Sequence, residues 1–392
     1  MSKKVPELRF KGFTDDWEER KLGEHAKYRR GSFPQPYGNK EWYDGEGAMP
    51  FVQVVDVTNK LTLVENTKQK ISKLAQSKSV FVPKGTVVVT LQGSIGRVAI
   101  TQYDSFVDRT LLIFEDYEKE TDERFWAYTI QKKFEIEKLK APGGTIKTIT
   151  KEALSSFDVH LPQFKEQAKI GSFFKQLDET IALHQRKLDL LKEQKKGFLQ
   201  KMFPKNGAKV PELRFKGFTD EWEERKLSDI ADRFDNLRVP ITASDRKPGD
   251  TPYYGANGIQ DYVEGFTHNG EFILVAEDGA NDLKNYPVQY VNGKVWVNNH
   301  AHVLQGKKTI TDNKFLMNAI KNFNIEPFLV GGGRAKLNAD VMMKLNILLP
   351  TFVEQEKIGS FFKQLDDTIA LHQRKLDLLK EQKKGFLQKM FV

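Results

Sequence analysis

The stretch LPQFKEQAKIGSFFKQLDETIALHQRKLDLLKEQKKGFLQKMF, residues 161–203, recurs as LPTFVEQEKIGSFFKQLDDTIALHQRKLDLLKEQKKGFLQKMF, residues 349–391, with four of 43 positions changed. Neither copy has a proline after its second residue, and both are rich in Leu, Lys, Glu and Gln, which favour helix. Each copy therefore predicts one helix of about 40 residues, roughly 60 Å long.

Apolar residues follow a heptad pattern along both predicted helices. We call the following residues the seam: Ile170, Phe174, Leu177, Ile181, Leu188 and Leu191, and in the second copy Ile358, Phe362, Leu365, Ile369, Leu376 and Leu379. A heptad seam needs a second apolar surface to cover it. Two nearly identical seams in one chain favour packing of the helices on each other, and packing on a partner protein stays an alternative. We expect Gly171, Gly197 and their copies to soften the helices.

A second repeat precedes each helix at a distance. VPELRFKGFTDDWEERKL, residues 5–22, returns at residues 210–227 with one change, Asp16 to Glu221. The segments between the repeats, 23–160 and 228–348, are only weakly alike. The period is too long for a solenoid, so the chain is a duplicated domain. We predict four parts: 1–160 and 205–348 as variable domains with their motifs, and 161–204 and 349–392 as long helices.

The variable segments predict mixed α/β domains, so the expected fold class is α+β with an internal pseudo-two-fold repeat. In the first segment we expect strands at 51–57, 87–90, 98–101 and 110–114 and a helix at 125–139. In the second we expect strands at 272–276, 288–291, 294–297 and 302–304 and a helix at 314–323. Asn292-Gly293 predicts a hairpin turn between two of these strands.

Composition excludes several classes of protein. The chain of 392 residues has no cysteine, which excludes disulfides, iron–sulfur ligation, cysteine zinc sites and thiol nucleophiles. No apolar run approaches the roughly 18 residues that a membrane span needs, and the N-terminal residues do not resemble a signal peptide. We expect a cytoplasmic protein without membrane contact. The net charge of +9 modestly favours an acidic partner such as nucleic acid.

Motifs of catalysis are missing from the sequence. There is no phosphate-binding G-x-x-x-x-G-K-[ST] loop, no G-x-S-x-G elbow and no Pro-Pro pair of the kind that an amino-methyltransferase motif requires. Asn298–His302 contains two histidines, but no partner at metal-ligand spacing accompanies them, and we expect no metal site. The absence of catalytic motifs favours a recognition subunit.

The arrangement of motif, variable domain and long helix, given twice, strongly resembles the DNA-specificity (S) subunit of a Type I restriction–modification system. The resemblance covers essentially the whole chain and includes MPFVQVVDVTN (49–59), FVPKGTVVVTLQGSIGRVAI (81–100) and VNNHAHVL (297–304). It implies two target-recognition domains, each reading half of a bipartite, asymmetric site on double-stranded DNA, separated by an antiparallel coiled coil.

The resemblance also implies partners and cofactors. The chain would have no catalytic activity and no cofactor of its own. It would recruit two methyltransferase subunits and, in the complete system, restriction/translocase subunits. S-adenosylmethionine, ATP and Mg would bind in those partner subunits.

Residues that suit base or phosphate contacts are proposed within this resemblance, because Arg, Asn and Gln read base edges and Lys, Ser and backbone amides hold phosphates. The expected DNA-binding residues are Arg29, Arg30, Ser32, Gln92, Gly93, Ser94, Arg97, Arg109 and Lys147 in the first domain, and Asn236, Arg238, Tyr254, Asn257, Asn281, Asn299, His300, Arg334 and Lys336 in the second. Glycines 93 and 96 would let the backbone approach a phosphate, or form an ordinary turn. Two other functions stay open: a DNA-binding scaffold that has no enzyme partner, and a chain with its own nuclease or methyltransferase.

Overall fold

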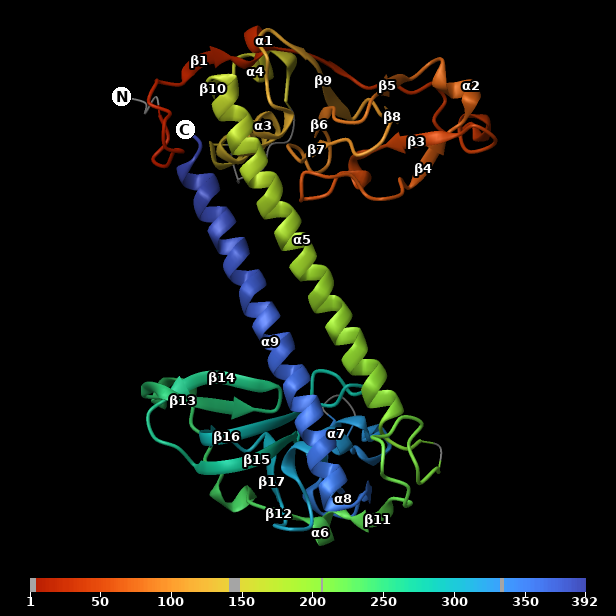
Figure 1. Ribbon diagram of the computed structural model, residues 1–392, viewed down its shortest axis with the longest axis vertical. Coiled ribbons are helices and arrows are strands. Elements are labelled where there is room, and N and C mark those ends of the chain that lie inside the picture. The colour runs from red at the N-terminus through yellow and green to blue at the C-terminus, as the bar shows by residue number, and fades with distance from the viewer. Residues whose placement is uncertain (1–4, 141–148, 206, 332–334) are drawn as a thin grey trace. The chain divides into compact units, whose positions relative to one another are not determined.

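The computed structural model describes residues 5–140, 149–205, 207–331 and 335–392. The chain divides into two compact units (Figure 1). Unit 1 holds residues 1–184 and 375–392, and unit 2 holds residues 185–374, so each long helix contributes to both units. The boundaries that we predicted lie near the helix ends, whereas the compact units divide within the helices.

Unit 1 contains a variable domain with two four-stranded sheets. One sheet has the order β2-β9-β6-β7 and the other β4-β3-β8-β5. The elements are β1 (Glu18–Lys21), α1 (Leu22–His25), β2 (Ala26–Arg30), η1 (Lys40–Trp42), β3 (Met49–Val52), η2 (Val54–Asp56), β4 (Gln69–Ile71), α2 (Lys73–Gln76), β5 (Val80–Val82), β6 (Val87–Thr90), β7 (Val98–Ile100), β8 (Ser105–Val107), β9 (Leu111–Tyr117), α3 (Glu123–Lys140), α4 (Lys151–Ser155), β10 (Asp158–Leu161) and α5 (Phe164–Lys201), which continues into unit 2.

Unit 2 contains one six-stranded sheet of order β12-β17-β15-β16-β13-β14. Its elements are β11 (Glu223–Lys226), α6 (Leu227–Ile230), β12 (Ala231–Arg233), η4 (Asp235–Leu237), η5 (Ala243–Asp245), β13 (Pro248–Gly255), β14 (Gly258–Val263), β15 (His268–Ala276), β16 (Val288–Val297), β17 (Ala301–Gly306), α7 (Asn313–Asn322), η6 (Glu326–Phe328), α8 (Ala339–Met342), β18 (Asn346–Leu349) and α9 (Phe352–Lys389), which continues into unit 1. The two variable domains therefore have different sheets.

The repeated segments build the same frame in each unit. β1 pairs antiparallel with β10, and β11 pairs with β18 in the equivalent register, Glu18 facing Leu161 and Glu223 facing Leu349. Arg9 holds the buried Glu166 at 2.7 Å in unit 1, and Arg214 holds Glu354 at the same distance in unit 2. The nearly identical sequences therefore repeat these tertiary contacts as well as their secondary structure.

The two long helices run antiparallel within each unit. In unit 1 the first turns of α5 lie against the last turns of α9, where the rings of Phe173 and Phe386 are 5.1 Å apart. In unit 2 the end of α5 lies against the beginning of α9, where Phe198 and Phe361 are 5.0 Å apart. The α+β class, with mixed domains, paired antiparallel helices and an internal repeat, is confirmed.

Most of the seam is buried, although part of it serves the domain cores. Ile170 and Phe174 join Trp17 and Phe125 in the core of unit 1, and Ile358 and Phe362 join the core of unit 2. Leu188, Leu191 and Leu376 are buried, and the remaining seam residues are half-buried: Leu177, Ile181, Leu365, Ile369 and Leu379. The ends of the helices are thus anchored in the domains that they connect.

Two predicted elements are wrong. The Asn292-Gly293 hairpin is absent, because β16 runs unbroken from Val288 to Val297 and Gly293 faces Gly270 of β15. Both glycines have positive φ, 101° and 145°, so the strands accommodate an irregularity without a turn. The strand expected at 51–57 ends at Val52 and continues as the 3-10 turn η2.

Gly171 and Gly359 have a packing role that the sequence did not reveal. A Cβ atom on Gly171 would lie 2.1 Å from a carboxylate oxygen of Asp122, and one on Gly359 would lie 2.4 Å from Asp312. These aspartates accept hydrogen bonds from the first amides of α3 and α7. The glycines let each long helix approach the beginning of its neighbouring helix. Gly197 and Gly385 have no atoms within 4 Å of a Cβ position.

Candidate nucleic-acid interface

A cleft of about 430 Å³ opens in the variable domain of unit 1. The residues around it come from the loop between β2 and η1, from η2 and β4 with the residues just before them, and from the turn between β8 and β9. They include Tyr37, Gln53, Val55, Lys68 and Arg109. The guanidinium of Arg109 lies 5.1 Å from the centre of the Tyr37 ring. Arg109, which the sequence proposed, therefore stands at a concave surface with polar side chains.

Asp108 fixes the floor of this cleft. Its buried carboxylate accepts hydrogen bonds from the amide and hydroxyl of Thr110, at 2.9 and 2.5 Å, and from the hydroxyl of Tyr37. Burial, together with the hydrogen bond to Asp108, raises the pKa of Tyr37 above its ordinary value. Tyr37 therefore remains a neutral donor, and its ring gives Arg109 a rigid support.

The glycine-containing loop after β6 lies beside the same cleft. A Cβ atom on Gly93 would be 3.6 Å from Val54, which belongs to the cleft, and Gln92, Gly93 and Ser94 are exposed. Gly96 has a different role, because a Cβ atom there would lie 2.7 Å from the Phe134 ring. The sequence proposed both glycines for backbone approach to a phosphate, but Gly96 is needed for packing on α3.

The other proposed residues of unit 1 lie elsewhere. Arg29 pairs with Glu115 at 2.9 Å, Arg30 borders a separate cleft of about 280 Å³ beside Leu154, and the Ser32 hydroxyl donates to the Lys78 carbonyl. Arg97 is half-buried and donates to the carbonyl of Val57 at 3.5 Å. Lys147 lies outside the described residues.

In unit 2 three loops bring several proposed residues together. The side-chain oxygen of Asn257 accepts from the amide of Asn281 at 2.9 Å, and its nitrogen donates to the Gly279 carbonyl. His300 bonds Asp278 at 2.6 Å through Nδ1. The backbone of Glu277 bonds His300 on one side and Leu337 on the other, at 2.8 and 2.7 Å. The loops after β13, β15 and β16 thus form one surface.

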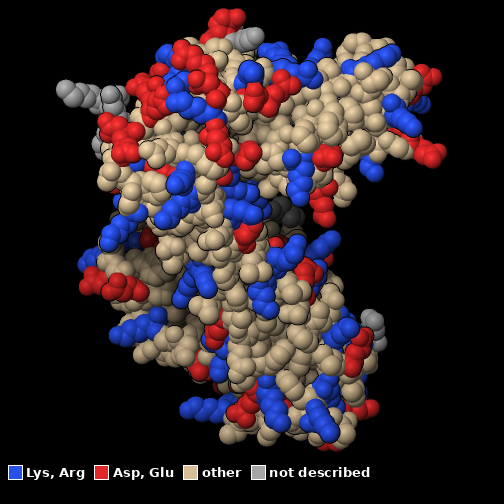
Figure 2. Space-filling view, turned by 45° about the horizontal axis from the view of Figure 1, so that its top comes forward, with Lys and Arg blue, Asp and Glu red and all other residues tan. Residues whose placement is uncertain are grey.

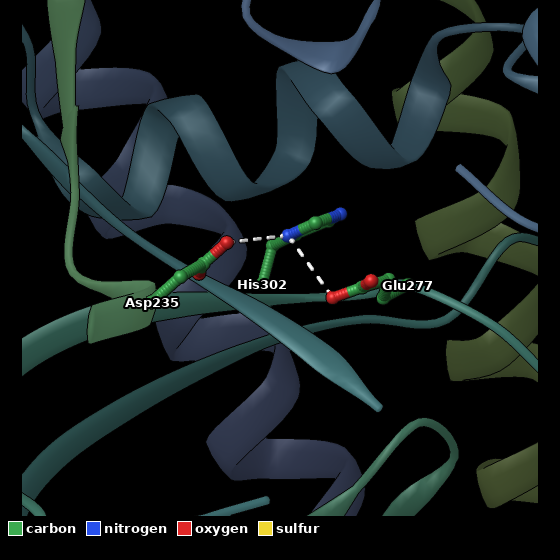
Figure 3. Close-up of side chains that lie close together, drawn as sticks. All are labelled: Asp235, Glu277 and His302. Carbon is green, nitrogen blue, oxygen red and sulfur yellow. Dashed lines mark hydrogen bonds and ion pairs between the residues drawn. The ribbon is translucent and has the colours of Figure 1, made fainter. Parts of the chain in front are cut away.

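An ion-pair network inside the domain holds the loops of this surface in place. Figure 3 shows Asp235, Glu277 and His302, where His302 Nδ1 lies 2.7 Å from Asp235 and 3.6 Å from Glu277. Arg238 reaches Glu277 at 2.7 Å, and Lys336 reaches its other oxygen at 2.9 Å. Arg238 also donates to the Ala301 carbonyl at 2.9 Å. Arg238 and Lys336, both proposed for DNA, are therefore engaged within the domain.

The network lowers the pKa of both carboxyl groups. Burial raises the pKa of Asp235, but the hydrogen bonds from His302 and the Val303 amide outweigh burial and bring it below the ordinary value. Burial likewise raises the pKa of Glu277, and hydrogen bonds from Arg238 and Lys336 outweigh it. The carboxylates are stabilised in their charged form by cations of the chain itself.

The same three side chains are the group within the described residues whose ligand atoms could hold a metal ion. The oxygens of Glu277 already face Arg238 and Lys336, and His302 Nε2 faces the Leu337 carbonyl at 2.8 Å. A metal ion would have to displace these cations. The arrangement fits an internal network that fixes the loops.

The remaining proposed residues of unit 2 differ in exposure. Asn236 and Asn299 are exposed, whereas Tyr254 is half-buried against the cluster that contains Phe272. Arg334 lies outside the described residues. Sequence reasoning missed Tyr37 and Gln53 as cleft residues, since they are 16 positions apart in the chain and only the fold brings them together.

Charges of both signs are interspersed over the face in Figure 2. No helix within the described ranges is long and apolar enough to cross a membrane. The net charge of the variable domains is nearly neutral. Nucleic-acid contacts of these domains must therefore use local groups, such as the cleft at Arg109 in unit 1 and the loop surface at Asn281 in unit 2.

Known proteins resemble this chain over most of its length. The model of the Type I restriction modification DNA specificity domain matches residues 14–193 and again 219–381. A protein assigned as a type I restriction enzyme specificity subunit in Haemophilus influenzae is 44% identical over 167 residues, which span 43% of this chain and 42% of that protein. The MjaVIII specificity subunit of Methanocaldococcus jannaschii is 20% identical over 95% of this chain and 91% of its own length.

Two solved structures share the fold. The S subunit of the Type I restriction–modification system from M. genitalium has a TM-score of 0.71 at 17% identity and covers 99% of both chains. A chain from a structural study of complex assembly and conformational transition in the type I R-M system has a TM-score of 0.51 at 16% identity, covering 96% of this chain and 97% of that one.

Proposed function

Because this chain belongs to the family of Type I restriction–modification DNA-specificity subunits, we propose that each unit reads one half of a bipartite site on double-stranded DNA and that the halves differ in sequence. One observation carries the proposal: the units share a frame built from nearly identical sequences, yet they hold different sheets and different polar surfaces. A homodimer would offer two identical readers and would favour a palindrome.

The polar groups on the two surfaces support different base contacts. In unit 1, Arg109 stands on the Tyr37 ring beside the loop of Gln92 and Ser94, and an arginine at such a position suits guanine. In unit 2, Asn281 and Asn299 are exposed on adjoining loops, and asparagine amides suit adenine. The fixed network below the second surface keeps these loops in place.

The long helices supply repeated surfaces for protein partners. Leu183 and Leu190 of α5 and their copies Leu371 and Leu378 of α9 are all at least half exposed. Identical exposed leucines on both helices suit two copies of one partner, the methyltransferase subunit. Restriction/translocase subunits would join that complex. S-adenosylmethionine, ATP and Mg would be bound by those partners, this chain would have no catalytic activity, and it would act in the cytoplasm, where the DNA lies.

Methylation mapping tests this proposal. The chain is expressed with its methyltransferase partner, and methylated bases are mapped across the genome by single-molecule sequencing. The expected result is one split motif with two different halves. A palindromic motif, or methylation without sequence preference, would contradict it. Cleavage or methyl transfer by the purified chain alone would show that it is an enzyme in its own right.

Single asparagines test the assignment within unit 2. Asn281→Ala should relax one position of one half-site, at a cost of about 1–3 kcal/mol in discrimination, and leave the other half unchanged. Asn292→Ala is the matched control, because Asn292 is also exposed but lies within β16. Relaxed sequence preference in both half-sites, or an equal effect of Asn292→Ala, would show that Asn281 does not read a base.

A further inference from the structure

A cleft in unit 2, of about 590 Å³, is bordered by five lysines from two helices and one loop. Lys192, Lys195 and Lys196 come from α5, Lys284 from the loop between β15 and β16, and Lys321 from α7. Only two carboxylates border the same space, Glu326 and Asp366, and Asp366 is paired with Lys195. The cleft therefore has an excess of positive charge, although the variable domain as a whole is nearly neutral.

The lysines of this cleft repel one another. Burial and the neighbouring charge of Lys195 lower the pKa of Lys321 below its ordinary value. The side-chain amides of Asn285, Asn322 and Gln200 also border the space and offer further donors. An anion with several oxygens would relieve the repulsion and accept from these donors.

The cleft is joined to the candidate reading surface by one loop. Asn281 and Lys284 lie three residues apart between β15 and β16, and Asp282 fixes the loop by accepting from the amides of Lys284 and Asn285 at 2.9 Å. Asn281 contacts Asn257 at the reading surface, whereas Lys284 borders the lysine cleft. One short loop therefore carries a residue of each place.

Unit 1 repeats the three helix lysines as Lys380, Lys383 and Lys384, but it differs from unit 2 in the variable segment. Lys383, the copy of Lys195, pairs with Asp178 at 2.6 Å and lies 5.0 Å from the centre of the Tyr128 ring. Gln131 stands six residues after Phe125 in α3, as Lys321 stands six residues after Phe315 in α7. Tyr128 has the smaller Asn318 as its counterpart in unit 2. The two lysines that have no copy in unit 1, Lys284 and Lys321, therefore come from the variable part of unit 2.

We infer that the lysine cleft binds backbone phosphates of the DNA next to the half-site that unit 2 reads, independently of base sequence. This inference rests on the proposed function. Lysine ammonium groups and amide donors hold phosphates without reading bases, and each phosphate that is neutralised releases counterions. The cleft would add a salt-dependent contribution to the DNA affinity at the second half-site. The equivalent residues of unit 1 would not supply this contribution.

The test uses the complex with the methyltransferase and two DNA duplexes of equal length, one with the mapped site and one unrelated. Lys284→Gln with Lys321→Gln removes two charges outside the helix repeats, and Gln is the residue that α3 carries at the position of Lys321. Affinity is measured over a series of salt concentrations. The slope of log K against log salt should become shallower by about 2, with a similar loss of affinity on both duplexes.

Two controls make the result specific. Lys308→Gln with Lys344→Gln removes the same charge from exposed positions of unit 2 that do not border the cleft, and should change the slope less. Lys192→Gln with Lys196→Gln should reproduce the effect, whereas the same change in the repeat copy, Lys380→Gln with Lys384→Gln, should not.

Three outcomes would overturn the inference. A slope that matches the control variants would mean that no phosphate enters the cleft. Normal DNA affinity with loss of the methyltransferase would assign the cleft to an acidic protein surface. A changed methylation motif would assign it to base reading. If the wild-type complex itself bound no specific site, the proposed function would fail first, and that result is separate from these.

Discussion

The sequence alone leaves two roles open for Arg238, DNA binding and an ion pair within the domain. From sequence it is a cation in a loop, suited to DNA. In the fold its guanidinium reaches Glu277 at 2.7 Å and the Ala301 carbonyl at 2.9 Å, and its side chain is only 15% exposed. Nothing local in the sequence indicates Glu277, which is 39 residues away. The internal role depends on a long-range contact.

Arg238→Ala should therefore destabilise unit 2, by about 3 kcal/mol, because it leaves the Glu277 carboxylate with one partner fewer in a half-buried site. Arg225→Ala removes an exposed pair with Glu223 and should cost below about 1 kcal/mol. Denaturant unfolding of both variants measures the difference. If Arg238→Ala keeps normal stability and loses DNA affinity, the DNA role proposed from sequence is the better one.

The same network predicts a pH dependence. Asp235 and Glu277 have pKa values below the ordinary 3.8 and 4.5, so their contribution to stability is complete above those values. It is lost as the pH falls through the lower folded pKa values. Asp235→Asn should melt at a lower temperature than the wild type at neutral pH, and this difference in melting temperature should narrow as the pH falls below 3.8. A difference in melting temperature that stays constant with pH would mean that the charge of the Asp235 carboxylate contributes nothing to stability.

Among the elements, the long helices were predicted best. Their observed bounds, Phe164–Lys201 and Phe352–Lys389, follow from heptads without internal proline. The prediction of a hairpin at Asn292-Gly293 was wrong, because pairing with β15 along β16 outweighs the local preference of this dipeptide for a turn. The clefts could not be predicted, since their residues come from segments that only the sheets bring together. The roles of the glycines could not be predicted either, because they depend on the neighbouring helix.

The helix glycines give a matched prediction. Gly171→Ala and Gly359→Ala should destabilise the chain, because the new methyl group would meet the carboxylates that cap α3 and α7. Gly197→Ala and Gly385→Ala should stabilise it, by up to about 1 kcal/mol each, because alanine favours helix and the space is open. Thermal unfolding of the four variants checks this. An equal gain at all four positions would show that the close contacts are misplaced.

Charge reversal tests the pairing of the helices. Asp366→Lys should lower the melting temperature, because it faces Lys195 within unit 2, and adding Lys195→Asp should restore most of the loss. Asp178→Lys should be restored by Lys383→Asp in the same way within unit 1. The crossed combination, Asp366→Lys with Lys383→Asp, should give no recovery. Equal rescue by both partners would contradict the antiparallel register.

At the scale of the whole molecule, duplication explains why one chain has a constant frame and two different readers. The frame repeats down to single ion pairs, Arg9 with Glu166 and Arg214 with Glu354. The variable domains differ in the number and order of their strands. A change within one variable domain should therefore alter recognition by that unit alone, provided that the frame is untouched.

Methylation mapping of a chimera tests this claim most directly. Residues 23–160 are replaced by the equivalent segment of another family member whose split motif is known, with both repeats retained. The methylated bases are then mapped in cells that also express the methyltransferase. We predict a new motif in which one half comes from the donor and the other half is that of the original chain. A motif changed in both halves, or in neither, from a complex that still assembles would contradict the account.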